Sequence, residues 1–199
     1  MALFKVGRRT SVDWKEQSDN ALLKAIASGD MSAFEEVHRR YFVKLMRFAM
    51  RIADSQGAAE EVANDTLMTV WRTADRFEGR SKPSTWMFGI AYRMAMKARQ
   101  KLEKRRGDVE LDEGMIGVDA DGADKVILRT DLAEALRQLT PDLRAVVELT
   151  YFNGYIYTEI AEILECPVGT VKTRMMTARR RLRALLDDTD VIPVEKTVG

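Results

Sequence analysis

The segment from Pro167 to Leu186 carries the side chains that are best suited to bind nucleic acid. One face of this predicted helix is apolar at helical spacing and consists of Val171, Met175, Ala178, Leu182 and Leu185. The opposite face is polar and cationic, no acidic residue interrupts the segment, and the members of that face are Gly169, Lys172, Thr173, Met176, Thr177, Arg179, Arg180 and Arg183. Such a face fits the major groove of DNA, where cations meet phosphates and polar side chains meet base edges.

Two questions about this basic face stay open on sequence alone. Most runs of charged residues are solvated faces of amphipathic helices, so this face could have no partner at all. Arg174 lies near the edge of the apolar stripe, so it either pairs within its own domain or holds a phosphate. The pattern as a whole still favours DNA binding.

A second short helix precedes the basic helix across a tight turn, an order that is typical of a helix-turn-helix motif. Residues 157–164 place apolar side chains on one helical face, and Cys166-Pro167 ends that helix. Ala161 provides the small residue that two crossing helices need where their backbones meet. Gly169-Thr170 then opens the basic helix, so the motif predicts a unit that reads DNA.

Charge is segregated along the chain, although the net charge of the 199 residues is only +1. The stretch 93–106 is strongly basic with Glu103 as its one acidic residue, and 107–124 is acidic without Lys or Arg. A DNA phosphate responds to local charge, because screening limits the interaction to about 8 Å. The balanced total therefore does not exclude a nucleic-acid partner.

Composition argues against several other classes of protein. The one cysteine, Cys166, leaves no internal disulfide, and the one histidine, His38, leaves no zinc cluster. Cys166 is expected to be a buried turn residue and His38 a surface residue. No apolar run reaches the roughly 20 residues that span a bilayer, and the first ten residues lack a signal-peptide core, so a cytoplasmic protein without membrane insertion or cofactor is predicted.

Helical periodicity elsewhere predicts an all-α protein of two small domains, which fit the pattern better than one core. One amphipathic helix ends near Gly29-Asp30, two longer helices cover 34–52 and 58–73, and a loop runs over 75–83. Ser84 is the expected cap of the next helix, which begins apolar and ends cationic. The first predicted domain covers 18–105 and the second covers 125–187, which opens with a helix over 125–139. An acidic flexible linker at 106–124 joins them. A weakly structured arm at 1–17, with Trp14 packing on the first domain, precedes them, and a disordered tail at 188–199 follows.

Two blocks of sequence carry a family resemblance. The first is EEVANDTLMTVWR at 60–72, followed by Arg76-Phe77, Ser84-Thr85-Trp86 and Ile90-Ala91. The second is Leu139-Thr140-Pro141 with Arg144, then Gly154, Tyr157, Glu159-Ile160-Ala161 and PVGTVKTR at 167–174. In this order, and with an acidic connector between them, the blocks resemble the bacterial RNA polymerase sigma factors of the extracytoplasmic-function (ECF) type over about residues 20–186.

The resemblance implies a transcription initiation factor that binds core RNA polymerase, recognises minus-35 and minus-10 promoter elements, and is controlled by an anti-sigma factor. Polymerase contacts would be the β′ coiled coil and the β flap. The side chains that correspond to the coiled-coil docking helix are Glu61, Asn64 and Asp65, which without the resemblance would be interpreted as a solvated helix face.

The resemblance also implies DNA-binding roles for individual residues. Cations for the minus-10 element would come from Arg80, Lys82, Arg93, Lys97, Arg99 and Lys101. Tyr92 could stack on flipped bases, as could Phe77 and Trp86, for which core packing is the favoured role. At the minus-35 element, base edges would be met by Lys172, Thr173, Met176 and Thr177, and phosphates by Tyr157, Thr170, Arg179, Arg180 and, unless it pairs internally, Arg174.

This chain departs from the family pattern at two places. Many members have glycine in the turn where this chain has Glu165, and a left-handed backbone there would strain an acidic residue unless the turn is built differently. Tyr92-Arg93 replaces a common Arg-Asn pair, and Lys97 stands where a short polar residue is usual. Base specificity at the minus-10 element is therefore not carried over from the family.

Two other functions have requirements that the sequence can be checked for. A helix-turn-helix regulator of the one-component or response-regulator kind would need a ligand pocket or a phospho-acceptor domain in the first half, where strands and helices do not alternate. An enzyme acting on nucleic acid would need a carboxylate cluster, and Glu60, Glu61 and Asp65 are explained as a docking face.

The acidic linker either imitates nucleic acid in a basic polymerase channel or is a solvated spacer.

Overall fold

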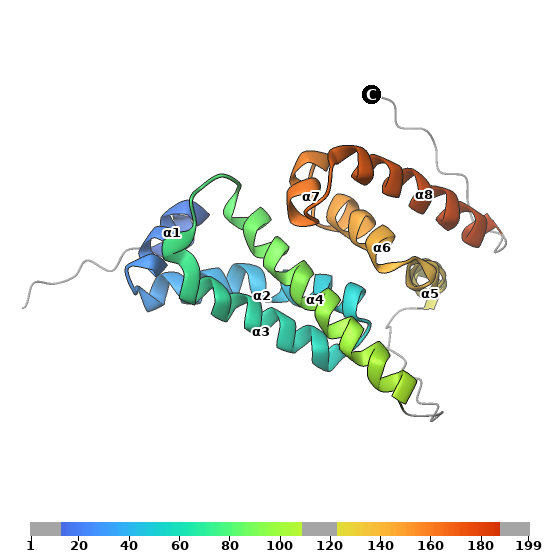
Figure 1. Ribbon diagram of the computed structural model, residues 1–199, viewed down its shortest axis with the longest axis horizontal. Helices are drawn as coiled ribbons and strands as arrows, with labels where there is room; N and C mark the ends of the chain where they lie inside the picture. Colours follow the sequence, from blue (N-terminus) through green and yellow to red (C-terminus); the bar gives the residue numbers. More distant parts are fainter. Residues whose placement is uncertain (1–12, 109–122, 188–199) are drawn as a thin grey trace, which may run out of the picture.

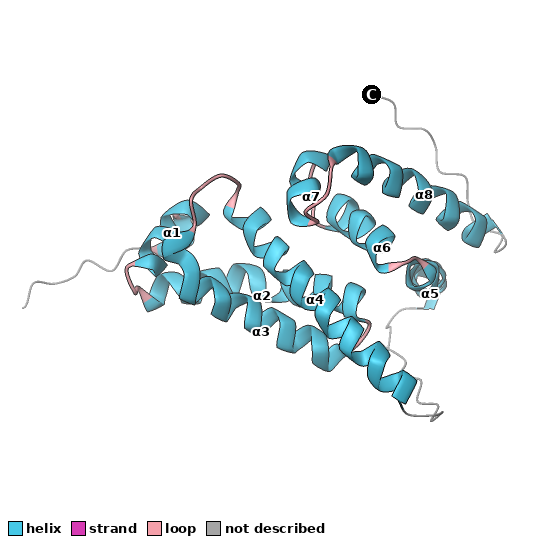
Figure 2. Ribbon diagram, in the orientation of Figure 1, coloured by secondary structure: helices cyan, strands magenta, loops and turns pink. Residues whose placement is uncertain are grey.

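The computed structural model describes residues 13–108 and 123–187, and within these ranges helices are joined by turns and loops without any strand (Figure 2). The N-terminal unit contains α1 (Asp19–Ala27), α2 (Met31–Ala53), α3 (Gln56–Thr73) and α4 (Pro83–Asp108), with short 3-10 turns η1 (Trp14–Glu16) and η2 (Ala74–Arg76). The C-terminal unit contains α5 (Ala123–Gln138), α6 (Pro141–Val147), the π-helical turn η3 (Glu148–Phe152), α7 (Tyr157–Ile163) and α8 (Val168–Asp187). The predicted all-α class is confirmed.

Short polar side chains start the first three helices. Ser18, Asp30 and Ser55 each accept a hydrogen bond from the backbone N–H three residues later, over 3.3, 3.1 and 3.5 Å respectively. The Ser55 cap starts α3 at Gln56, two residues before the start predicted from periodicity.

The start of α4 differs from the sequence prediction. The helix begins at Pro83, so Ser84 lies inside the first turn and its expected role as the cap is wrong. Proline suits the first helical position, because its fixed φ is helical and its missing N–H would have had no partner within the helix.

The N-terminal unit is a bundle in which α2, α3 and α4 pack on one another, with α1 against α2 (Figure 1). The rings of Phe48 on α2 and Phe88 on α4 lie 5.3 Å apart between their centroids at the centre of this core. Trp14 packs against the same core, as predicted. Arg40 donates to the backbone oxygens of Trp14 and Lys15 over 2.9 and 2.8 Å, which ties the described end of the predicted arm to α2.

The C-terminal unit is built around the helix-turn-helix formed by α7 and α8. In this unit α8 packs on α5, α6 and α7. Ala161, the small residue predicted where the two helices cross, is buried, and so are the apolar residues expected to close the angle between them, Ile160, Leu164 and Val171. The helix-turn-helix inferred from the sequence is therefore present with the expected core.

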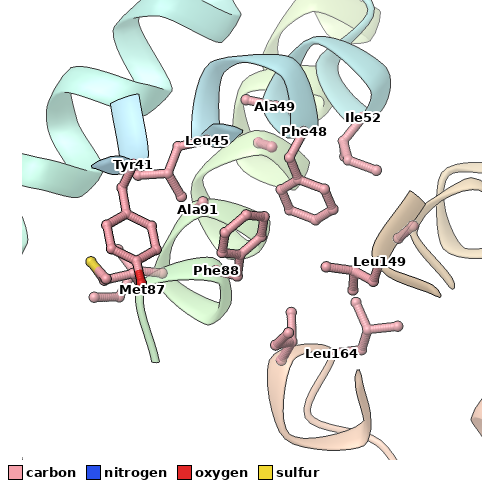
Figure 3. Packing of buried hydrophobic residues seen from close by; sticks show 14 of the residues in the cluster. Tyr41, Leu45, Phe48, Ala49, Ile52, Met87, Phe88, Ala91, Leu149 and Leu164 are labelled. Atoms are coloured by element: carbon pink, nitrogen blue, oxygen red, sulfur yellow. The ribbon is translucent and has the colours of Figure 1, made fainter. Parts of the chain in front are cut away.

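The two units meet along a surface that we call the seam. The seam is formed by Arg51, Phe88, Tyr92 and Arg93 on α2 and α4, and by Asp142, Arg144, Glu148, Tyr155 and Glu165 from the C-terminal unit. Figure 3 shows Leu149 and Leu164 across from Phe48 and Phe88, and all four belong to one hydrophobic cluster. The sequence indicated two separate compact units, but their buried residues form a continuous core.

Several predicted segments lie outside the described residues. These are residues 1–12 of the arm, 109–122 of the acidic linker, and the tail. Among the helices that the structure does describe, none combines the length and apolar character needed to cross a bilayer.

Candidate nucleic-acid interface

The polar face of α8 is open to solvent in the structure. Lys172, Thr173, Met176, Arg179 and Arg180 are exposed, and Thr170, Thr177 and the nearby Tyr157 of α7 are half-buried. These side chains border a shallow groove whose lining includes Tyr157, Lys172, Met176, Arg179, Arg180 and Arg183. Met176 is 66% exposed, so an apolar side chain lies in the middle of a cationic surface. This combination suits contact with base edges, including thymine methyl groups.

Within the described residues, the cations on this face have no carboxylate partner. Lys172 and Arg180 form no ion pair there. Arg179 donates through Nε and Nη2 to the hydroxyl of Tyr151 over 3.1 and 2.8 Å, and this neutral partner leaves its charge uncompensated. Sequence reasoning missed Tyr151, because no local pattern links η3 to α8.

Arg174 takes the internal role that the sequence left open. Its guanidinium lies 2.5 Å from a carboxylate oxygen of Asp142, and its side chain is only 25% exposed. Asp142 also accepts a hydrogen bond from the Tyr92 hydroxyl over 2.8 Å. Burial and the nearby Asp142 carboxylate raise the pKa of Tyr92. Asp142 therefore connects α8 with α4, and Arg174 is engaged by that connection.

The turn between α7 and α8 keeps a left-handed residue although that residue is glutamate. Glu165 has φ of 51°. The N–H of Cys166 bonds to the carbonyl of Ala161 over 3.0 Å and that of Glu165 to Glu162 over 3.3 Å, the two bonds of a Schellman helix end. Cys166 itself is half-buried. A non-glycine residue in this conformation costs about 1 kcal/mol, so the turn tolerates strain rather than adopting another geometry.

Several of the cations predicted for the minus-10 element have carboxylate neighbours within their own unit. Arg80 pairs with Glu78 over 2.6 Å, and Arg99 pairs with Glu103 over 2.7 Å. Arg99 also donates to the carbonyl of Ile52 over 3.3 Å. In contrast, Lys97 and Lys101 are exposed without an ion pair to any described residue.

Two other members of that set are paired with the C-terminal unit. Lys82 lies 2.6 Å from Glu159 of α7, and Arg93 pairs with Glu165 in the turn that follows α7. The Lys82 ammonium lowers the pKa of Glu159 by donating a hydrogen bond to its carboxylate. Residues that are 77 and 72 positions apart in sequence are thus brought together by the packing of α4 on α7.

The aromatic residues near these cations have structural contacts. The rings of Phe77 and Trp86 lie 5.2 Å apart and pack against the hydrophobic core, which confirms the core packing favoured from sequence. Phe88 contacts Tyr155 of the C-terminal unit with 5.3 Å between ring centroids. At the surface of α2, His38 is exposed as predicted and stacks on Phe42.

An exposed polar stripe lies on α3. Glu61, Asn64 and Asp65 are all exposed and share one helical face. Met68 continues that face and is 41% exposed, which is unusual for a large apolar side chain. Met68 lies seven residues after Glu61, or about two helical turns, so the sequence spacing alone places it on this face. The stripe combines charge, amide and thioether groups in a way that suits a protein partner.

The seam contains buried charge. Arg144 is 2% exposed and donates to the carbonyls of Arg51 and Leu139 over 2.7 and 3.1 Å, and to that of Arg137. Glu148 is 4% exposed, with Arg51 Nε 3.3 Å from its carboxylate. Burial raises the pKa of Glu148 to about 7, although both arginines oppose the shift. These groups hold the C-terminal unit against the end of α2.

The C-terminal unit carries a cationic helix-turn-helix, and the N-terminal unit carries the basic helix α4 and the exposed stripe on α3. Together these features define a DNA-binding protein that also has a surface suited to a protein partner. Family models for sigma-70 region 2 and sigma-70 region 4 match residues 37–106 and 129–182. The ECF RNA polymerase sigma factor SigK of Mycobacterium tuberculosis is 31% identical over 175 residues, covering 84% of this chain and 93% of that protein. This chain belongs to the ECF RNA polymerase sigma factors and is a transcription initiation factor.

Solved structures agree with this assignment. The sigma factor RpoE of Bartonella quintana, in complex with the anti-sigma factor NepR, matches with a TM-score of 0.63 and 28% identity over 79% of this chain and 98% of that one. CnrH in complex with the cytosolic domain of CnrY matches with a TM-score of 0.67 and 25% identity over 87% of this chain and all of that one. These matches favour the sigma factor over the alternative of a response-regulator-like helix-turn-helix protein.

Proposed function

We propose that the two units of this sigma factor divide promoter recognition between them, with α8 reading the minus-35 element. Lys172, Thr173, Met176 and Thr177 face base edges, while Thr170, Tyr157, Arg179 and Arg180 hold phosphates. The observation that carries this proposal is the open cationic face of α8, whose free charges have no carboxylate partner among the described residues. Arg174 supports the face indirectly through its pair with Asp142.

The N-terminal unit binds the minus-10 element through α4 and the loop that precedes it. Lys97 and Lys101 are available cations, and the side chain of Arg80 is exposed enough to exchange its neighbouring carboxylate for a phosphate. Arg99 is mostly buried, so it would have to leave Glu103 and the Ile52 carbonyl to reach a phosphate. Lys82 and Arg93 join them once Glu159 and Glu165 have moved away. Unstacking bases costs a few kcal/mol, which cation–phosphate contacts offset.

Polymerase binding is assigned to separate surfaces. The stripe of Glu61, Asn64, Asp65 and Met68 docks on the β′ coiled coil, and the C-terminal unit meets the β flap. The domains on which these roles rest are residues 18–105 and 125–187. Because the relevant template is chromosomal DNA, the protein acts in the cytoplasm.

Control by an anti-sigma factor is part of the proposal. The RpoE relative is seen with the anti-sigma factor NepR, and it shares the fold over most of both chains. An anti-sigma factor for this chain would bind where it blocks the α3 stripe or the DNA faces.

Transcription with purified core polymerase over a library of promoter sequences tests the function. Specific transcripts should start when this chain is the only sigma factor added, and enriched promoters should share two separated elements. Transcription that requires another sigma factor in the reaction would instead identify a regulator that recruits or blocks polymerase.

A further inference from the structure

Tyr151 meets the DNA-facing surface of α8, although it belongs to η3. Its side chain is 58% exposed, and its hydroxyl contacts the guanidinium of Arg179, which is 28 residues later in the sequence. Arg179 is exposed as well and lines the groove on α8. The contact lies outside the hydrophobic core, so its consequence is the placement of the Arg179 side chain.

The backbone of Tyr151 is fixed by the π-helical turn η3. Glu148 and Leu149 are buried and anchor the beginning of the turn. At the other end Asn153 donates twice to the Glu148 carbonyl, from its backbone N–H over 3.1 Å and from its side-chain amide over 3.0 Å. Turns of this type are rare and occur frequently at functional sites. The phenol is therefore presented to α8 from an ordered backbone.

The Tyr151 hydroxyl occupies one edge of the Arg179 guanidinium. Nε and Nη2 both donate to it, over 3.1 and 2.8 Å. The guanidinium carbon lies 5.9 Å from the ring centre, close to the limit of a cation–π contact, so the hydroxyl rather than the ring face makes the interaction. A guanidinium is planar and carries five N–H donors. The edge formed by Nη1 and Nη2 therefore remains open for a second partner.

That open edge suits a phosphate of the DNA backbone. Two parallel N–H···O bonds from one guanidinium edge match two oxygens of a phosphate, and the opposite charges strengthen both bonds. Within the parts of the chain that the structure describes, Arg179 pairs with no carboxylate that would compete for this edge.

Arg180 follows Arg179 in sequence but has no such support. It is exposed and lines the same groove. No residue in 13–108 or 123–187 accepts a hydrogen bond or an ion pair from its guanidinium. Successive residues of a helix project about 100° apart, so the two side chains leave α8 in different directions. Two neighbouring arginines on one surface thus differ in whether the tertiary structure holds them.

We propose that Tyr151 is a positioning residue for promoter binding, which holds Arg179 so that its Nη1–Nη2 edge receives one phosphate of the minus-35 element. The inference rests on the phosphate role proposed for Arg179. An unsupported arginine loses rotamer freedom when it binds, whereas a side chain that is already held loses less. Tyr151 therefore raises DNA affinity without a base contact, and it does so equally for every promoter sequence.

Removing the hydroxyl provides the first test. Holoenzyme containing Tyr151→Phe should bind promoters selected by the wild-type chain about two- to tenfold more weakly, the range expected for ordering one long side chain. The loss should be the same on every promoter, and the urea midpoint of the variant should match wild type. Wild-type affinity of the Tyr151→Phe holoenzyme would overturn the proposal, as would a loss confined to particular promoters.

A double-mutant cycle separates positioning of Arg179 from a general effect on the surface. In an Arg179→Ala background, Tyr151→Phe should weaken binding by less than about twofold, because no guanidinium is left to hold. In an Arg180→Ala background, which is the matched control, Tyr151→Phe should keep its full effect. An equal loss in the two backgrounds would show that Tyr151 acts independently of Arg179.

Arg179→Lys tests the guanidinium edge without any change at Tyr151. Lysine keeps the charge but lacks the planar fork, so holoenzyme affinity should fall about three- to tenfold while the slope of log affinity against log salt stays at its wild-type value. Unchanged affinity would exclude a bidentate contact and overturn the proposal. This measurement decides alone if Tyr151→Phe does not fold.

Neutral phosphate analogues locate the contact on the DNA. Single methylphosphonates are placed along the minus-35 element of a selected promoter, and holoenzyme affinity is measured at each position. One substitution should weaken wild-type binding and should matter less to both Tyr151→Phe and Arg179→Ala. Loss of sensitivity at different phosphates in the two variants would contradict a shared contact.

The Arg179→Ala holoenzyme separates this inference from the proposed function. If wild type does not bind promoters, or if Arg179→Ala binds them as well as wild type, the proposed function of this face has failed. If Arg179→Ala weakens binding and Tyr151→Phe does not, only the positioning role of Tyr151 has failed.

Discussion

Charged side chains in the seam and on α8 have opposite surroundings. In the seam, Arg144 and Glu148 are almost fully buried and are held by carbonyls or by a partner of opposite charge. On α8, Lys172 and Arg180 are exposed and pair with no carboxylate among the described residues. The same residue types thus serve assembly in one region and remain available to a ligand in the other.

The difference shows that burial and pairing, rather than the number of cations, identify a DNA-binding surface. A buried guanidinium that is held by backbone carbonyls cannot reach a phosphate without breaking the fold. An exposed, unpaired cation gains a phosphate at little structural cost. Seam variants should therefore change stability, whereas α8 variants should change DNA binding.

Replacing Arg144 should have the largest effect. Arg144→Met leaves three backbone carbonyls without their donor and removes a neutralising neighbour of Glu148, so the free energy of unfolding should fall by about 3 to 5 kcal/mol. Urea unfolding measures the change. Arg180→Met is the matched control and should stay within about 0.5 kcal/mol of wild type. A loss below about 1 kcal/mol for Arg144→Met would remove the distinction between the two regions.

Replacing Glu148 with glutamine should remove a pH dependence of the unfolding free energy that comes from the buried carboxyl group. The pKa of Glu148 is raised from 4.5 to about 7, so the folded state binds a proton more tightly than the unfolded state. The wild type therefore loses stability relative to the glutamine variant as pH rises from about 4.5 through 7, by about 3 kcal/mol in total. Thermal or urea unfolding of both proteins at pH 4 and pH 8 measures it. A stability difference that does not change with pH would contradict burial of this carboxyl group.

Lys172→Ala should change which promoters are chosen. Loss of a base contact alters discrimination at one or two base pairs by about 2 kcal/mol, while unfolding stability stays near that of wild type. Transcription from a library of minus-35 sequences, compared with the wild-type profile, measures the change. An unaltered profile with uniformly weaker activity would assign Lys172 to the phosphate backbone.

Arg180→Ala should have the smallest effect, and it should be the same on every sequence. Affinity for duplex DNA should fall by about 1 kcal/mol, and the slope of log affinity against log salt should flatten by about 1. Holoenzyme binding to promoter DNA at several salt concentrations provides both values. A change confined to particular promoters would mean that Arg180 contacts bases.

Local patterns in the sequence predicted most of the fold. The apolar stripe of α8 and the buried residues Ile160, Ala161, Leu164 and Val171 follow from helical periodicity, which depends only on neighbours along the chain. Patterns near helix ends were less informative. Serine is a common N-cap residue, so Ser84 was expected to precede α4, but the helix begins at Pro83, whose fixed φ suits the first helical position. The polymerase and DNA contacts assigned to individual residues remain predictions.

By itself, the sequence determined the helices, the helix-turn-helix and the family, because each is encoded in spacing over a few turns. Only the tertiary structure decided which charges are free. Arg174 pairs with Asp142, Lys82 with Glu159, and Arg93 with Glu165 through the packing of helices that are distant in sequence. An ion pair requires two groups within about 4 Å, and no pattern along one helix specifies which carboxylate another helix will bring there.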